Sequence, residues 1–147
     1  MPILNYTTEI STNKTIGEIQ CILGRAKAQA IMLEYDNGMV SAISFKTRGP
    51  FGIVSFRLPA NIDKLFSLIS RSKKIPVKKR TREQAARVAF RILKDWLEAQ
   101  MALIEVEMVT MEQVFLPYAQ NSTGATLYET LAEGKFSGLA LPAPAAP

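Results

Sequence analysis

The side chains whose type and spacing suggest a chemistry are lysines and arginines gathered in one part of the chain. Residues 71–94 hold ten Lys and Arg and a single acid, Glu83, a net charge of +9. The whole chain carries +5, so the remainder is −4. Repulsion within such a cluster is relieved by a polyanion, and neutralising nucleic-acid phosphates also releases condensed counterions. The sequence therefore predicts a phosphate-rich partner, bound with salt-sensitive affinity and without base preference.

Ten residues are candidates for these contacts. We expect phosphate contacts from Lys73, Lys74, Lys78, Lys79, Arg80 and Arg82, extended along a helix by Arg87 and Arg91 and, from a sheet, by Arg48 and Arg57. The alternative interpretation is that these bases are ordinary solvent-exposed residues that bind no partner. Three pairs at helical spacing favour that alternative on the helix, since opposite charges four residues apart can pair. The pairs are Glu83 with Arg87, Arg91 with Asp95, and Lys94 with Glu98.

Aromatic residues interleaved with bases give a second indication. The predicted strands carry Tyr35, Phe45, Phe51 and Phe56 beside Lys46, Arg48 and Arg57. Single-strand binders stack bases on exposed rings while cations follow the backbone. The alternative is that the phenylalanines are core residues, in which case only the basic loop remains.

Other chemistry is largely excluded by composition. The 147 residues contain no histidine, the usual general base and metal ligand near neutral pH. The single cysteine, Cys21, can build neither an internal disulfide nor a thiolate metal site, which fits a reducing cytoplasm. No Walker A or GxGxxG loop occurs, and the acids do not converge. We therefore expect a protein without enzymatic activity, cofactor or metal, and without catalytic residues.

Four strands are predicted, over residues 3–10, 30–36, 39–46 and 51–58. The pair Asn37-Gly38 supplies the two positive-φ residues of a type I′ turn, so 30–46 should form a hairpin. Residues 3–10 alternate moderately and are rich in β-branched and aromatic types.

Four helices are predicted, over residues 16–28, 61–71, 82–108 and 111–117. Thr15 with Glu18 and Thr81 with Gln84 match capping boxes, Asn61 is a good N-cap, and Thr110 can cap the last short helix. Dense charge around Pro76 predicts an exposed loop at 71–80.

These elements define one α+β domain, residues 1–120. A three- to four-stranded antiparallel meander would be packed by an N-terminal helix and by a C-terminal helical region with one long amphipathic helix. Residues 121–147 should be weakly structured, with one further turn at 126–131 and a disordered Pro/Ala tail from 141. No apolar run approaches the ~20 residues of a membrane span, and the N-terminus lacks a secretory signal, so no membrane association is expected.

Several segments over residues 5–130 resemble a family of small phage and prophage accessory proteins that has no settled activity. The matching segments are Asn5-Tyr6-Thr7-Thr8, Thr15–Gln20, Glu34-Tyr35-Asp36, Phe56–Asn61, Arg82-Glu83-Gln84-Ala85, Arg91–Gln100, Phe115-Leu116-Pro117-Tyr118 and Leu127-Tyr128-Glu129. The resemblance implies a phage protein acting in the cytoplasm of a bacterial host. It favours DNA transactions and inhibition of host defence equally.

Three hypotheses are consistent with these features. The first is a nucleic-acid-binding protein, preferring single-stranded DNA, in phage replication or recombination. The alternative is an inhibitor of a bacterial defence system that binds a protein or sequesters a nucleotide signal, because a small charged ligand is also drawn to clustered bases. The third is an assembly protein whose long helix pairs with a copy of itself, and we expect a homo-oligomer.

Overall fold

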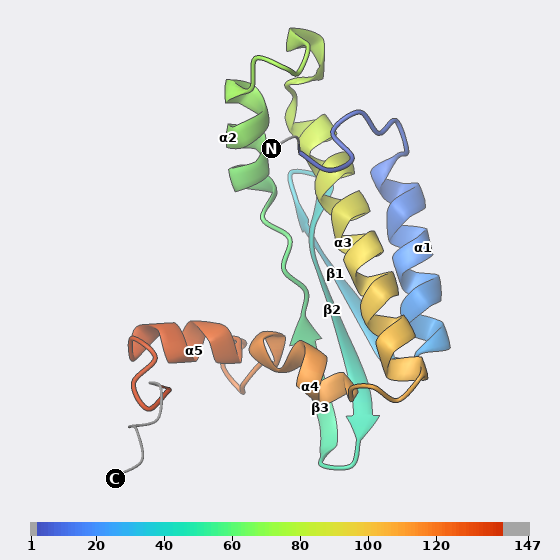
Figure 1. Ribbon diagram of the computed structural model, residues 1–147, viewed down its shortest axis with the longest axis vertical. Coiled ribbons are helices and arrows are strands. Elements are labelled where there is room, and N and C mark those ends of the chain that lie inside the picture. Colours follow the sequence, from blue (N-terminus) through green and yellow to red (C-terminus); the bar gives the residue numbers. More distant parts are fainter. Residues whose placement is uncertain (1–2, 140–147) are drawn as a thin grey trace, which may run out of the picture.

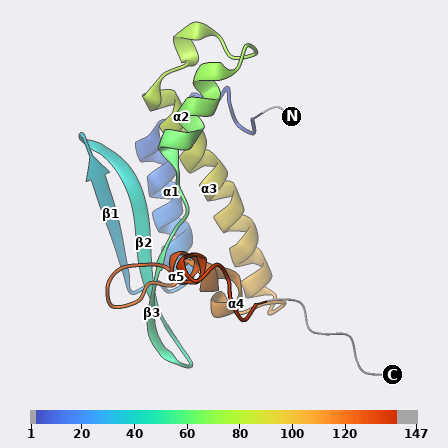
Figure 2. The ribbon, with the colours of Figure 1, turned by 90° about the vertical axis from the view of Figure 1, so that its left-hand side faces the viewer.

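The protein is an α+β fold in which two helices cover one face of a small sheet (Figure 1). The computed structural model describes residues 3–139. Strands β1 (Ala30–Asp36), β2 (Met39–Gly49) and β3 (Gly52–Arg57) form an antiparallel sheet in the order β1-β2-β3. Helices α1 (Thr12–Arg25) and α3 (Arg82–Glu105) pack side by side against it (Figures 1 and 2). The predicted fold class is confirmed.

Shorter elements extend this body at both ends. Helix α2 (Ile62–Arg71) packs on α3 and is joined to it through a 3₁₀ turn, η1 (Val77–Lys79). At the opposite end, α4 (Met111–Phe115) and a second 3₁₀ turn, η2 (Leu116–Tyr118), lead to α5 (Leu127–Glu133), which projects sideways (Figure 1). Within residues 3–139, no helix combines the length and apolarity that crossing a bilayer requires. The predicted Pro/Ala tail lies outside the described residues.

The hairpin between β1 and β2 is the prediction that the structure matches most closely. Asn37 and Gly38 have φ of 50° and 79°, and Asp36 pairs with Met39 across a two-residue loop. Both central residues are thus in the left-handed region, as a type I′ turn requires. A register shift between Glu34 and Tyr35 adds one residue to β2 at this end.

The predicted strand over residues 3–10 is wrong. Asn5 has a φ of 61°, and turns form as Tyr6 N–H donates to the Ile3 carbonyl and Thr8 N–H to the Asn5 carbonyl. The carbonyls of Tyr6 and Thr8 instead accept from the side-chain amide of Gln84 on α3. Local β-propensity is overridden here because a buried side chain, not a neighbouring strand, satisfies this backbone. Since Gln84 is engaged in this way, the reciprocal half of its predicted capping box does not form.

Helix α1 begins four residues before its predicted start, at Thr12. Its N-cap is Ser11, whose hydroxyl accepts from Lys14 N–H at 3.2 Å. The capping box predicted at Thr15 is therefore wrong, and Thr15 is fully buried within the helix. The helix ends at Arg25 because Lys27 adopts a left-handed φ of 66°.

The remaining caps follow the sequence closely. Asn61, Thr81 and Thr110 all cap their helices by accepting from the N3 amide. Helix α3 ends at Glu105, three residues earlier than predicted, where Glu107 turns left-handed at φ 62°.

Aromatic rings form the centre of the core where sheet, α3 and α4 meet. Phe115 lies 5.5 Å from Phe45, 5.7 Å from Phe56 and 5.5 Å from Trp96 between ring centroids. Phe45, Phe56 and Phe115 are at most 1% exposed. These contacts between residues distant in the chain tie α4 to the sheet and to the long helix.

Candidate nucleic-acid interface

Five of the ten predicted basic residues lie in the segment 72–81, which joins α2 to α3. This segment is exposed, as expected, but it is folded. Ile75 is 2% exposed and anchors the segment in the core. The Ile75 carbonyl accepts from Arg80 Nε at 2.9 Å, and Lys79 N–H donates to the Pro76 carbonyl at 2.9 Å. The lysines around this anchor are therefore presented on a defined backbone.

Four lysines of this segment have no acidic partner within residues 3–139. Lys73, Lys74 and Lys78 are exposed and Lys79 is half-buried. Across residues 3–139, ion pairs within 4.0 Å form at other bases, namely Arg57, Arg82, Arg91 and Lys94. The charge of the four lysines is thus not offset by carboxylates of the described chain.

A cavity of about 290 Å³ gathers three of the bases. Lys78 and Lys79 line it from the segment, and Arg87 lines it from α3. Thr81 and Gln84 contribute to the wall, and Glu9 is the one acid on it. We call Lys73, Lys74, Lys78, Lys79 and Arg87 the cationic surface.

Arg87 is held in place by Gln84, which the sequence predicts only as a capping residue of the same helix. The side-chain oxygen of Gln84 accepts from Arg87 Nη1 at 3.2 Å, while the Gln84 amide donates to the carbonyls of Tyr6 and Thr8. The predicted pair of Arg87 with Glu83 is absent from the ion pairs of residues 3–139. The three-residue spacing of Gln84 and Arg87 on a helix was the available signal.

Arg80 and Arg82 are partly engaged within the fold. Arg80 uses its Nε to fasten the segment to the Ile75 carbonyl. Arg82 forms an ion pair with Asp63 on α2, and both side chains remain substantially exposed. Their contribution to a partner is therefore expected to be smaller than that of the lysines.

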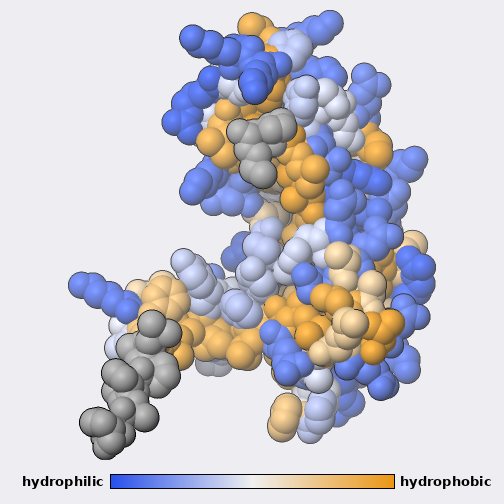
Figure 3. Space-filling view, in the orientation of Figure 1, coloured by the Kyte–Doolittle hydropathy of each residue, from blue (hydrophilic) through white to orange (hydrophobic). Residues whose placement is uncertain are grey.

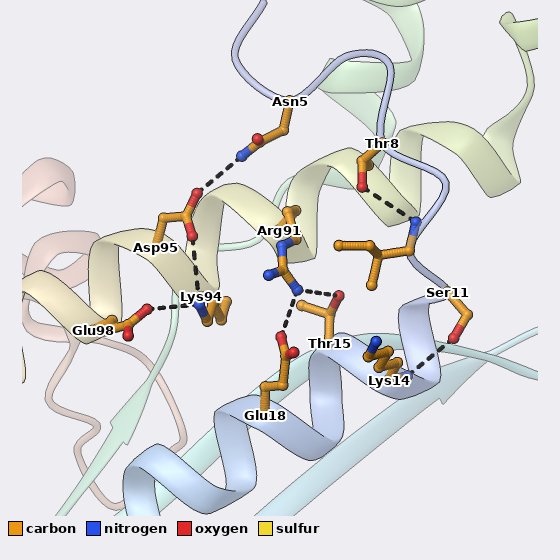
Figure 4. A network of polar contacts seen from close by, with 11 residues as sticks. Asn5, Thr8, Ser11, Lys14, Thr15, Glu18, Arg91, Lys94, Asp95 and Glu98 are labelled. Carbon is orange, nitrogen blue, oxygen red and sulfur yellow. Dashed lines mark hydrogen bonds and ion pairs between the residues drawn. The ribbon is translucent and has the colours of Figure 1, made fainter.

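Arg91 faces α1 rather than the cationic surface (Figure 4). Its Nη1 pairs with Glu18 and also donates to the Thr15 hydroxyl at 3.4 Å, and only 16% of its side chain is exposed. The predicted pairing of Arg91 with Asp95 is wrong, because Asp95 instead accepts from Asn5 and lies 3.8 Å from Lys94. The predicted pair of Lys94 with Glu98 is confirmed at 2.6 Å.

We therefore expect Arg91 to stabilise the fold and Arg87 to contact a bound oligonucleotide. We expect Arg91→Leu to lower the free energy of unfolding by about 1–3 kcal/mol, since it leaves Glu18 without its charged partner. Oligonucleotide affinity should change less than about twofold, a negligible free energy. Arg87→Leu, one helical turn away, should show the reverse pattern in urea titration and binding assays. Loss of affinity in Arg91→Leu at full stability would contradict this division.

The two arginines predicted from the sheet are not brought together with the cationic surface. Arg57 pairs with Glu34 across the sheet at 3.1 Å. Arg48 pairs in register with Ile53 next to the β2–β3 turn, which lies at the far end of the molecule from residues 72–81 (Figure 1).

Two of the four candidate stacking rings are also excluded. Phe45 and Phe56 are 1% exposed and belong to the core, so they cannot stack on a base. Phe51 is 89% exposed but lies in the β2–β3 turn, distant from the lysines. Tyr35 is 64% exposed and precedes the β1–β2 turn.

Tyr35 is the exposed ring at the cationic end of the molecule. Its neighbour Asp36 lines a small cavity together with Asp63 and Arg82, which places the hairpin tip beside the start of α3. Figure 3 shows hydrophilic residues along both sides of this end of the molecule, with hydrophobic residues between them. The exposed ring is therefore next to a residue that lines a cavity with Arg82, at the start of α3.

The comparisons with known proteins add no assignment. No family model, curated protein or solved structure matches this chain. A functional interpretation therefore depends on the architecture and on the arrangement of charge.

Proposed function

We propose that this protein binds nucleic acid through its phosphates at the cationic surface, without catalysing a reaction. The observation that carries the proposal is the convergence of Lys78, Lys79 and Arg87 on one cavity, beside the unpaired Lys73 and Lys74. Closely spaced cations attract anions, and a polyphosphate chain supplies several at once. The sequence resemblance suggests phage replication or recombination inside a bacterial cell as the setting.

Single-stranded DNA is the preferred form in this proposal. Tyr35 is exposed and adjoins the cavity that Arg82 lines, so an unpaired base stacked on this ring would bring its phosphate toward the basic start of α3. A duplex offers no free base face to that ring. The sheet as a whole is not the stacking platform, because Phe45 and Phe56 are buried.

The role of Tyr35 gives a prediction. Tyr35→Ala should weaken binding to single-stranded DNA about tenfold, within the roughly 1–3 kcal/mol of one stacked base. Binding to a duplex of equal length should be unaffected. Fluorescence anisotropy with both oligonucleotides measures the difference, and Phe51→Ala is the matched control because its ring is exposed at the other end. Equal losses on both DNA forms would contradict stacking.

The proposal itself is tested by the salt dependence of binding. With five cations engaged, the plot of log affinity against log salt for a single strand should have a slope of about −3 to −4. A labelled oligonucleotide titrated between about 50 and 200 mM salt gives this slope. Absence of binding at the low-salt end, or affinity independent of salt, would refute the proposal.

The cavity also favours a second candidate function. Its three bases, with the donors and acceptors of Thr81, could enclose the phosphates of a small nucleotide. An inhibitor of bacterial defence that sequesters a nucleotide signal would use such a site. Calorimetric titration with mononucleotides and dinucleotides separates the two. Tight, stoichiometric nucleotide binding that an oligonucleotide does not displace would support sequestration, and weak binding that an oligonucleotide abolishes would support the first proposal.

A further inference from the structure

The C-terminal arm, residues 126–139, leaves its apolar side chains largely uncovered. Helix α5 has no buried residue, and η2 is the element it packs against. Tyr128 is 55% exposed, Phe136 41% and Leu139 63%, while Leu131 is half-buried. In Figure 1 the arm projects away from the body, and Figure 3 shows hydrophobic residues on its surface. A helix this short needs packing to be stable, because nucleation alone is unfavourable.

The base of the arm is a hydrogen-bonded turn that fixes its direction. Leu127 N–H donates to the Ala119 carbonyl at 2.8 Å, and Asn121 N–H donates to the Ala125 carbonyl at 2.8 Å. The Asn121 side-chain oxygen accepts from Thr123 N–H at 2.9 Å and Ala125 N–H at 3.1 Å. The Leu127–Ala119 bond joins the arm to the chain before the turn, and swinging the arm back onto its own body would break it.

An apolar groove lies on the body between α2, α3 and η2. Its volume is about 350 Å³, and its lining includes Pro59, Leu65, Ala89, Ile92, Trp96 and Tyr118. Figure 3 shows the surface hollowed between the arm and the α2 end. Leu68, less than one turn after Leu65 on α2, is 42% exposed. The body thus presents apolar surface of the same kind as the arm.

The charges of the two surfaces are complementary. Helix α5 contains Glu129 and Glu133 and no Lys or Arg, and one base, Lys135, follows it in the arm. Beside the groove, Lys64 on α2 is next to the lining residue Leu65, while the one acid of α2, Asp63, is paired with Arg82. An acidic amphipathic helix would therefore be attracted to this groove and oriented in it.

We propose that the arm of one copy docks in the apolar groove of a second copy, and that the exchange is reciprocal in a two-fold dimer. The rigid turn directs the arm outward, so a partner's groove is accessible to it while its own is not. In an isologous dimer both arms and both grooves are covered at once. The arm and the groove lie away from the cationic surface, so this inference stands apart from nucleic-acid binding.

Disulfide trapping between two differently tagged chains tests the exchange. Both chains carry Cys21→Ser, which removes the exposed native thiol. One chain carries Ala89→Cys in the groove and the other Leu131→Cys in the arm. Mild oxidation of the mixture should give a product that contains one chain of each tag, and neither chain alone should give it.

Two further measurements complete the test. Sedimentation of the native protein should give roughly twice the chain mass of 16.3 kDa. Tyr128→Ala with Leu131→Ala should convert it to a monomer with unchanged circular dichroism, because neither side chain is buried in its own chain. A monomer throughout the native concentration range would overturn the proposal. So would a chain carrying both cysteines that closes within itself and yields no two-chain product.

Discussion

Replacing Lys73, Lys74, Lys78 and Lys79 together by Gln is expected to weaken binding to single-stranded DNA roughly 600-fold at about 0.1 M salt. Each phosphate contact with a single strand contributes about 0.7 to the salt slope, and hence about 0.7 log units of affinity at that salt. Four contacts therefore amount to about 2.8 log units, and the slope should become shallower by the same amount. Anisotropy titrations at several salt concentrations measure both quantities.

A matched control separates local contact from overall charge. Lys14, Lys27, Lys46 and Lys135 are also exposed, lie on other elements and have no ion pair among the described residues. Their replacement by Gln changes the net charge equally, and we expect an affinity loss of less than about tenfold, since distant exposed charges are screened by salt. If the two quadruple variants lost affinity equally, the cationic surface would not be the binding site.

The largest expected effect on stability is that of Phe115→Ala, a loss of about 3–5 kcal/mol in the free energy of unfolding. Phe115 is fully buried and lies within 5.7 Å of three other rings, so truncation leaves a cavity among side chains that cannot all move into it. The change also frees α4 from the sheet. Urea denaturation monitored by the fluorescence of Trp96 measures the loss.

The control for the Phe115 variant is the same substitution at a solvent-exposed phenylalanine. Phe51 is 89% exposed in the β2–β3 turn, so Phe51→Ala should change stability by less than about 0.5 kcal/mol. Similar losses in the two variants would mean that the aromatic cluster is not the centre of the core.

Elements defined by short-range patterns could be predicted from the sequence. The Asn37-Gly38 hairpin and the N-caps at Asn61, Thr81 and Thr110 depend on residues a few positions apart, and all of them form, although the capping box at Thr81 is only half made. The strand predicted over residues 3–10 failed for a long-range reason. Its carbonyls are taken by Gln84, more than seventy positions away, and no local pattern contains that partner.

The candidate site was predictable to a similar degree. Clustering of Lys73, Lys74, Lys78 and Lys79 is visible along the chain, and within residues 3–139 these lysines have no ion pair. The partners of Arg82 and Arg91 are Asp63 and Glu18, which only the packing of α2 and α1 on α3 brings close. The four-residue spacing favoured Asp95 as the partner of Arg91, because such spacing describes contacts within a single helix and not contacts between helices. The density of charge along the sequence thus indicates where the cationic surface lies. Tertiary packing determines which of its bases form ion pairs within the protein.

Lysine footprinting tests the central claim most directly. The native protein is acylated with and without single-stranded DNA at low salt, and each modified lysine is quantified by mass spectrometry. We expect DNA to protect Lys73, Lys74, Lys78 and Lys79 and to leave Lys14, Lys27 and Lys46 equally reactive. Protection of the second group alone, or reactivity unchanged at saturating DNA, would contradict binding at the cationic surface.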